Sequence, residues 1–228
     1  MQEQSDRGVL RVASTMTAMH LSGFIGELSE EIAHRLGRDR VDWVPMSWDK
    51  LLGTDHAPYD IAVQIVAIRP ERAELVDFSD PFIVANLGLL ARKDGALASA
   101  KSLAELRPYV LGGMHGGAGL ACINDVIRPE HPPKEFEHPF TTGQAVADGE
   151  VDGVVFPTPV AMALAHQFKT TTVVGQIETN DEYGIVFDKG SPLRARVNRI
   201  LAEMRTDGTW KRIVDAWFPG MDDIPVLS

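Results

Sequence analysis

A largely apolar run, Tyr59–Val66, constrains the fold more than any other stretch of the chain. A strand of this composition belongs in a sheet that other elements cover on both faces. Pro70, whose fixed φ suits the first position of a helix, and Arg72 follow the run. A guanidinium at a corner between a strand and a helix is typical of a place where anions bind. The sequence therefore predicts an α/β fold with Arg72 as a candidate anion-binding residue.

Strands and helices alternate through the N-terminal part of the chain, as α/β units require. The helix expected over Gly26–Leu36 has apolar residues at helical spacing and ends at Gly37. A short helix is expected from Pro70 to Asp77, because Ser79-Asp80-Pro81 breaks its continuation. The other expected elements here are strands over 9–12, 40–44 and 87–92 and a short helix over 48–52.

A second series of elements begins after the polar residues 93–95. Ser102 has the form of a helix cap before Leu103-Ala-Glu-Leu. The strand expected over 109–112 leads into a glycine loop, Gly113–Gly119, that opens a helix, and this order of elements indicates contact with a ligand. The remaining expected elements are helices over 120–127, 144–147, 159–167, 192–205 and 209–217 and strands over 153–156, 171–175 and 183–187.

Composition and charge exclude several classes of partner. The net charge of the 228-residue chain is −10 and no block of basic residues occurs, so neither nucleic acid nor an anionic membrane surface is an expected partner. Cys122 is the only cysteine, and its apolar neighbours predict a core residue rather than a nucleophile. No apolar run reaches the length of a membrane span. The N-terminal residues form no signal peptide, so we expect a cytoplasmic protein or one that begins, with an added Met1, after a removed signal peptide.

Motifs of other chemistries are incomplete. Gly113–Gly119 lacks the Gly-Lys-Ser/Thr of a phosphate-binding loop, and no Gly-x-Ser-x-Gly elbow is present. The histidines have no metal-ligand spacing. Met16, Met19 and His20 could form a soft-metal site, but methionines in an apolar loop more often serve packing. We therefore expect neither a cofactor nor a metal.

Short motifs, each different from the others, lie along nearly the whole chain. The strongest is Pro70-Glu-Arg72 together with Val76-Asp-Phe-Ser-Asp-Pro-Phe82. The others, in chain order, are Gly23-Phe24, Arg35-Leu36-Gly37, Val44-Pro45, Trp48-Asp49, Tyr59-Asp60-Ile61, Ser102-Leu-Ala-Glu-Leu, Gly149-Glu-Val-Asp152, Thr158-Pro-Val160, Tyr183-Gly184, Lys189-Gly190, Asp207-Gly208-Thr209-Trp210 and Trp217-Phe218. In this order, from about Leu10 to Phe218, the chain resembles the periplasmic amino-acid-binding proteins of ABC importers, solute-binding protein family 3.

The resemblance implies a type II periplasmic-binding fold of two α/β lobes. Lobe 1 is expected over 1–92 and 185–228, and lobe 2 over 93–184. Two crossing strands, near 90–94 and 180–186, would join the lobes, and a hinge motion would close them on a ligand in the cleft. The resemblance also implies a periplasmic monomer that does not insert into the membrane and whose partners are a small-molecule ligand and the membrane permease of an ABC importer.

In this family, the arginine at the position of Arg72 pairs with the α-carboxylate of the ligand. A planar guanidinium suits that role, because it can donate two parallel charge-assisted hydrogen bonds. The alternative is a surface arginine paired with Glu71 or Asp77. The full set of candidate ligand contacts is Ser14, Met16, Phe24, Gln64, Ile65, Ala67, Arg72, His115, Gly117, Ala118 and Thr158.

Several of these positions depart from the family's pattern. Pro157 stands where the family has the acid that holds the ligand's ammonium, and Gly117-Ala118 stands where a threonine pair is usual. Because a desolvated ammonium without an acceptor is costly, we expect ordinary polar amino acids to bind weakly. The expected ligand is a carboxylate or other anion without a free α-ammonium, or a mainly apolar molecule. Asp181 could reverse this expectation if it lies in the cleft.

Two other functions remain open. An enzyme on the same fold, similar to the cyclohexadienyl dehydratases, would need a carboxylic acid to protonate a leaving group. Glu27 and Asp181 are candidates, but neither is clearly placed, so no catalytic residue is predicted. A sensor domain would have a membrane-spanning flank in the full-length protein.

Overall fold

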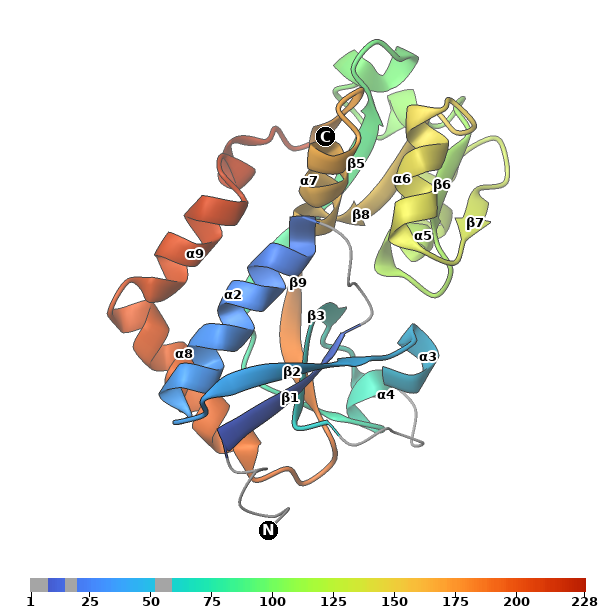
Figure 1. Cartoon of the computed structure of the whole chain (residues 1–228). Helices are drawn as coiled ribbons and strands as arrows, with labels where there is room; N and C mark the ends of the chain where they lie inside the picture. The colour runs from blue at the N-terminus through green and yellow to red at the C-terminus, as the bar shows by residue number, and fades with distance from the viewer. Residues whose placement is uncertain (1–7, 15–19, 52–58) are drawn as a thin grey trace. The chain divides into compact units, whose positions relative to one another are not determined.

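The computed structural model describes residues 8–14, 20–51 and 59–228 (Figure 1). They form two compact units, each built from two separate parts of the chain. Unit 1 comprises the described residues up to Val84 together with Glu182–Trp217, and unit 2 comprises Ala85–Asp181 and Phe218–Ser228. The sequence placed the boundaries at 92/93 and 184/185 and assigned 218–228 to the first lobe. The structure divides both connecting strands earlier and groups 218–228 with unit 2, because this segment pairs with a strand there.

Unit 1 contains a mixed sheet. Its first strand, β1 (Val9–Ser14), lies between β2 (Arg40–Pro45) and β3 (Ile61–Ala67) and pairs in parallel with both. The last residues of β9 (Thr171–Phe187) run antiparallel to β3 and to the short β4 (Asp77–Phe78). Every residue of β3 is buried, as the apolar composition of this stretch predicts.

Three helices of unit 1 pack together, with α2 (His20–Arg35) beside α8 (Leu193–Thr206) and α9 (Thr209–Trp217) (Figure 1). The core-facing residues of α2 include Phe24, Ile25, Leu28 and Ile32. The helix ends before Gly37, which has φ of 72° as predicted for its stop. Two short helices, α3 (Trp48–Leu51) and α4 (Pro70–Ala73), complete the unit. The helix at Pro70 is shorter than expected, because the chain turns after it and Asp77 enters β4.

The motif 76–82, part of the strongest sequence match, ties distant parts of unit 1 together. The Asp77 carboxylate accepts a hydrogen bond from the backbone N–H of Gly190 at 2.8 Å. The Ser79 hydroxyl accepts one from the backbone N–H of Ile185 at 3.0 Å. These side chains therefore hold the return of β9 into unit 1, which is a structural role.

The strands of unit 2 belong to the same nine-stranded sheet. They follow in the order β7 (Lys134–Phe136), β6 (Leu111–Met114), β8 (Gly153–Pro157) and β5 (Ile83–Arg92), with the first part of β9 beside β5. β6 runs parallel to both β7 and β8, whereas β5 and β8 are antiparallel. The main apolar cluster of unit 2 draws on these strands and on the helix that follows β6.

The helices of unit 2 are α5 (Ala118–Cys122), which continues as a π-helical turn over Ile123–Ile127, α6 (Pro139–Ala147) and α7 (Thr158–Gln167). Short 3-10 turns cover Ala96–Ser99, Ala104–Leu106 and Met221–Asp223. The helix expected after Ser102 was wrong in type, because Pro108 follows at once and cannot continue a helix. Likewise, the strands expected over 171–175 and 183–187 are parts of the single strand β9.

The segment Phe218–Ser228, which we call the C-terminal clasp, is built into unit 2. The side-chain amide of Gln176 donates to the carbonyl oxygens of Met221 at 2.9 Å and Ile224 at 3.1 Å. The backbone N–H of Leu227 donates to the carbonyl oxygen of Gln176 at 2.7 Å, and the Leu227 side chain is buried in the unit's main apolar cluster. The clasp thus completes the core of a unit whose other residues lie far earlier in the chain.

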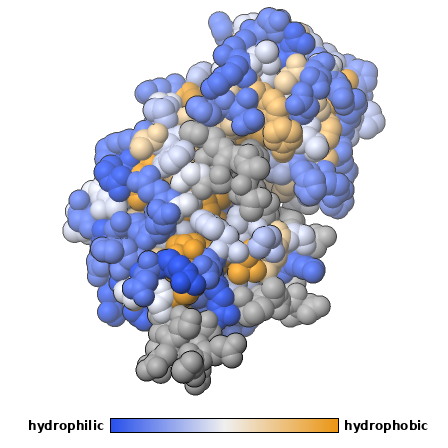
Figure 2. Space-filling view, viewed as in Figure 1, coloured by the Kyte–Doolittle hydropathy of each residue, from blue (hydrophilic) through white to orange (hydrophobic). Residues whose placement is uncertain are grey.

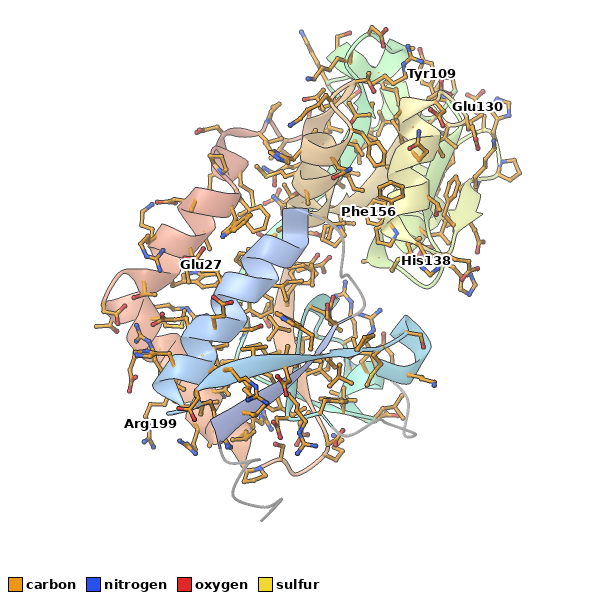
Figure 3. All side chains as sticks on the ribbon, viewed as in Figure 1. Glu27, Tyr109, Glu130, His138, Phe156 and Arg199 are labelled. Carbon is orange, nitrogen blue, oxygen red and sulfur yellow. The ribbon has the colours of Figure 1, made fainter. Side chains whose placement is uncertain are left out.

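One carboxylate of unit 1 links α2 to α9. Glu27, which is labelled in Figure 3, lies on α2. Its carboxylate accepts hydrogen bonds from Trp217 Nε1 at 2.7 Å and from Arg212 Nη1 at 2.6 Å. The bond from Trp217, followed by that from Arg212, lowers the pKa of the Glu27 carboxyl. Glu27 is therefore part of the helix packing, and its pKa shift is explained without a catalytic role.

The lowered pKa makes this contact sensitive to acid. A carboxyl whose pKa is lower in the folded state stabilises the protein above its unfolded-state pKa, and the effect is lost as the pH falls through the folded-state pKa. We expect Glu27→Gln to lower the Tm at pH 7 and to lower it less and less as the pH falls through the range in which the wild-type carboxyl takes up its proton. Thermal unfolding followed by circular dichroism from pH 7 into the acid range measures this. An equal loss at every pH would contradict the assignment.

Hydrophilic side chains cover most of the face shown in Figure 2. The large apolar side chains that are exposed lie on separate elements, namely Trp43, Leu75, Val84, Val126, Phe140 and Val226. Of the described helices, none is both long and apolar enough to span a membrane.

Candidate functional site

Unit 1 gathers predicted ligand contacts at the carboxyl ends of β1 and β3. Ser14 is the last residue of β1, and Ala67 is the last residue of β3. Gln64, fully buried on β3, donates its side-chain N–H to the Ser14 hydroxyl at 2.9 Å, which ties the end of β1 to the middle of β3. Ligands of α/β proteins commonly bind at this edge of a sheet.

Arg72 is held at the same edge. Its Nη1 donates to the carbonyl oxygen of Ala67 at 3.0 Å, and the side chain is partly buried. The alternative partner Asp77 is engaged elsewhere, since Lys189 Nζ lies 3.2 Å from its carboxylate. A guanidinium fixed at the carboxyl end of a strand can present parallel N–H donors to a carboxylate. Pairing of Arg72 with a ligand stays a prediction.

The other candidates in unit 1 differ in their surroundings. Ile65 and Ala67 are buried on β3. Phe24 is fully buried in the core rather than lying on an open wall, because its ring packs against Phe82 at 6.4 Å and Trp210 at 6.1 Å between centroids. Met16 lies outside the described residues.

Unit 2 places its candidates at the carboxyl ends of β6 and β8, which are parallel neighbours. The loop after β6 turns at Gly116, which has φ of 64°, and brings Gly117 and Ala118 to the start of α5. This helix packs closely on β8, since a Cβ on Gly119 would lie only 1.8 Å from the carbonyl oxygen of Val155. The glycine loop is therefore explained in part by close packing, independently of any ligand.

His115 lies at the exposed tip of this loop. Its Nδ1 is 2.7 Å from a carboxylate oxygen of Glu135 on β7, and both side chains are exposed. The backbone N–H of His115 donates to the carbonyl oxygen of Phe136 at 2.9 Å, which extends the pairing of β6 with β7. His115 is thus positioned by β7, and ligand contact by it stays a prediction.

The end of β8 carries no acid. Pro157 is the last residue of β8, and Thr158 begins α7. The Thr158 side chain is buried and its hydroxyl donates to the carbonyl oxygen of Asn86 on β5 at 2.9 Å. In the structure this hydroxyl therefore serves the contact between α7 and β5, whereas the sequence assigned it to the ligand.

Asp181 lies on β9, at the end of the Ala85–Asp181 part of unit 2. Among the aspartate and glutamate side chains that the structure describes, it alone is buried. Its exposed fraction is 5%, and the other buried polar side chains among the described residues are serine, threonine or glutamine. The residue before it, Asn180, has a left-handed backbone with φ of 50°. Sequence reasoning named Asp181 as a candidate but could not place it, because no local pattern in this stretch of the chain shows that its side chain is buried.

Cys122 on α5 is buried, as its apolar neighbours predict. Burial, and secondarily the charges of Asp181 and Asp125, raise the pKa of its thiol to about 11. We expect iodoacetamide at pH 8 to modify the folded protein about 100-fold more slowly than the protein in denaturant, because the thiolate is the reacting form. Mass spectrometry of timed samples measures both rates. Fast modification of the folded chain would contradict the burial.

No group of side chains suited to a metal ion occurs among residues 8–14, 20–51 and 59–228, where groups of histidine, cysteine, aspartate or glutamate were sought.

Comparison with known proteins identifies the family and the fold of the chain. The family model of the bacterial extracellular solute-binding proteins, family 3, matches residues 13–220. The chain belongs to this family, and the family assignment made from the motifs is confirmed. Its α/β architecture is that of the type II periplasmic-binding proteins, as expected.

Individual relatives are similar over most of their length. The L-cystine-binding protein TcyJ of Escherichia coli (strain K12) is 26% identical over 205 residues, which cover 87% of this chain and 74% of TcyJ. The arginine-binding extracellular protein ArtP of Bacillus subtilis (strain 168) is 25% identical over 217 residues, 88% of this chain and 79% of ArtP. The crystal structure of AncCDT-1 superposes with a TM-score of 0.77 at 30% identity, covering 95% of this chain and 98% of that one.

These relatives are named as binding proteins rather than enzymes. AncCDT-1 is described as an ancestral amino acid-binding protein and a precursor of cyclohexadienyl dehydratase. The neighbour with a link to the dehydratases is therefore itself a binding protein. The chain itself belongs to the family of solute-binding proteins whose model it matches.

Proposed function

We propose that this protein is the solute-binding component of an ABC importer and captures a small ligand that bears a carboxylate. The observation that carries the proposal is Arg72, held by its bond to Ala67 at the carboxyl end of β3 in a chain of this family. A carboxylate gains two charge-assisted hydrogen bonds there, which a neutral ligand cannot match.

The names of the relatives support a ligand from among the amino acids. TcyJ is named for L-cystine and ArtP for arginine, and AncCDT-1 is described as amino acid-binding. Each amino acid carries an α-carboxylate, whatever its side chain. Arg72 is suited to this shared group, while the elements around it set the selectivity.

In the proposed mechanism the ligand binds between the two units. From unit 1 we assign Ser14, Gln64, Ile65, Ala67 and Arg72 to the ligand side, and from unit 2 His115, Gly117 and Ala118. The chain passes between the units within β5 and β9, so changes of backbone angle there can close the units on the ligand. The ligand drives closure to the extent that it binds the closed state more tightly.

The proposal includes the partner and the location of the protein. The closed complex delivers its ligand to a membrane permease, and the protein acts as a periplasmic monomer. A sensor domain is the alternative, and the full-length gene product distinguishes the two, because a sensor carries a membrane-spanning segment beside this domain.

A thermal-shift screen tests the proposal. The panel consists of the standard L-amino acids, their α-hydroxy analogues and their amides, in which the carboxylate is blocked. A ligand at 100 times its Kd stabilises the folded state by about 2.7 kcal/mol. We expect at least one free carboxylate to raise the Tm and the matching amide to have no effect. If only amides or uncharged apolar compounds raise it, the carboxylate assignment fails.

A further inference from the structure

The chain passes between the two units three times. Two crossings lie within β5 and β9, at 84/85 and 181/182, and the third joins the end of α9 to the C-terminal clasp at 217/218. The sequence predicted only the first two, because it assigned 218–228 to the first lobe. A third connection constrains any motion of one unit against the other, so its anchorage on both sides decides its effect.

The third crossing has no slack on either side. Trp217 is fixed on unit 1, since its Nε1 donates to the Glu27 carboxylate at 2.7 Å and a Cβ on Gly23 of α2 would lie 2.1 Å from its ring. The next residue, Phe218, already belongs to unit 2 and is buried, with 2% exposed. One peptide bond therefore separates an anchored residue of unit 1 from a buried residue of unit 2.

Beyond the crossing, Gln176 of β9 fastens the clasp. Its side-chain amide donates to the carbonyl oxygens of Met221 and Ile224, which lie in the half of the clasp nearer the crossing. Its backbone N–H donates to the carbonyl oxygen of Pro225 at 2.7 Å, and its carbonyl oxygen accepts a hydrogen bond from the backbone N–H of Leu227. Gln176 is buried, and it holds the clasp by four hydrogen bonds.

The other two crossings are tied into the same network. The Oδ1 atom of Asn86 on β5 accepts hydrogen bonds from the backbone N–H groups of Thr179 and Asn180, each at 3.1 Å, just before β9 leaves unit 2. These bonds support the left-handed backbone of Asn180, which has φ of 50°. The Thr158 hydroxyl donates to the carbonyl oxygen of Asn86 and also lies 3.4 Å from the side-chain oxygen of Gln176. The three crossings are thus held together within unit 2.

We propose that the clasp is a strap of the hinge, which limits how far the two units separate when no ligand is bound. Two crossing strands alone can bend at the unit boundaries, whereas a third connection without slack shortens the range of that bending. With fewer open states, a larger fraction of the empty protein is competent to bind, and the apparent Kd falls as that fraction rises. The strap therefore raises affinity without touching the ligand. It acts whatever ligand is captured, which goes beyond the proposed function.

Lengthening the third crossing tests the strap without removing a contact. A Gly-Ser-Gly-Ser insertion between Trp217 and Phe218 leaves the bond to Glu27 and the bonds of the clasp in place. Spin labels on Arg199→Cys in unit 1 and Glu150→Cys in unit 2, both at exposed positions, report distances between the units by pulsed electron paramagnetic resonance. The protein is freed of small molecules by dialysis in denaturant and refolded. We expect the longest distances to increase by about 5 Å or more, within the ~14 Å that four extended residues can span.

The matched control carries the same insertion between His131 and Pro132, which are exposed in a loop within unit 2. Insertions in an exposed loop cost little, so this variant should keep the distances of the protein without an insertion. Cys122→Ala in every protein restricts the labels to the two introduced cysteines. Unchanged distances after lengthening of the crossing overturn the inference, and so does an equal increase in both insertion variants.

A second variant tests the strap if the lengthened protein fails to fold. Gln176→Leu removes the amide bonds to Met221 and Ile224 but keeps the size of the side chain, so it gives the crossing slack without an insertion. We expect it too to increase the longest distances. Gln144→Leu, which removes an exposed amide bonded to Asp148 within unit 2, should leave them unchanged. Unchanged distances in a Gln176→Leu protein that still unfolds cooperatively would then refute the strap.

Discussion

Arg72→Ala is expected to weaken binding of carboxylate ligands by about 100-fold or more. The substitution removes both charge-assisted hydrogen bonds and leaves the carboxylate of the bound ligand without its partner. The ligand-free protein should keep its Tm almost unchanged. Arg72 is only partly buried, on a helix without buried residues, and its bond to the Ala67 carbonyl is a contact at a strand end. Isothermal titration and thermal unfolding measure the two effects separately.

Two further variants sharpen this prediction. Arg72→Lys keeps the charge but cannot donate two parallel N–H bonds, so it should bind more weakly than wild type and more tightly than Arg72→Ala. Arg199→Ala removes an exposed arginine of α8 in the same unit and should leave affinity unchanged (Figure 3). Unaltered affinity in Arg72→Ala would exclude the carboxylate role, whereas a large loss of Tm would identify Arg72 as structural.

Gly119→Ala is expected to destabilise the protein by about 3 kcal/mol, through overpacking and backbone displacement. The new Cβ would lie 1.8 Å from the carbonyl oxygen of Val155, so α5 must move away from β8. Helix propensity alone predicts the opposite sign, because alanine is favoured over glycine inside a helix by about 1 kcal/mol. The midpoint of urea unfolding therefore distinguishes close packing from propensity.

Gly26→Ala is the matched control. Gly26 lies within α2, and no atom lies within 4 Å of the position that a Cβ would take. Propensity should dominate there, so this variant should be as stable as wild type or more stable by up to about 1 kcal/mol. If the two glycine variants behave alike, the close contact of α5 with β8 is not as described.

Local patterns predicted the elements of this fold well. The apolar stretch at β3, the helix ended by Gly37 and the glycine loop before α5 each depend on neighbours in sequence, and each lies where expected. The structural roles of the strongest motif were missed. Asp77 and Ser79 bond to Gly190 and to Ile185, partners more than a hundred positions along the chain, and no local period shows such contacts.

The candidate site was predictable only in part. Family motifs identify Arg72, because its position after β3 is fixed by the short helix at Pro70. They assign a ligand role to Phe24 and to the Thr158 hydroxyl, which the structure shows in core contacts. The burial of Asp181 was not visible, because it depends on how β9, β5 and α5 pack together in space.

The C-terminal clasp has a consequence for engineering by recombination. Unit 2 needs Phe218–Ser228 as well as Ala85–Asp181. Gln176 precedes residues 182–217 in the chain and holds the clasp by its side-chain amide, and Leu227 follows them and is buried in the core of the unit. A chimera that takes unit 2 from one relative must therefore transplant both segments together. Joining only the continuous middle piece to a foreign C-terminus would leave a core without its last leucine and a strand without its hydrogen-bond partner.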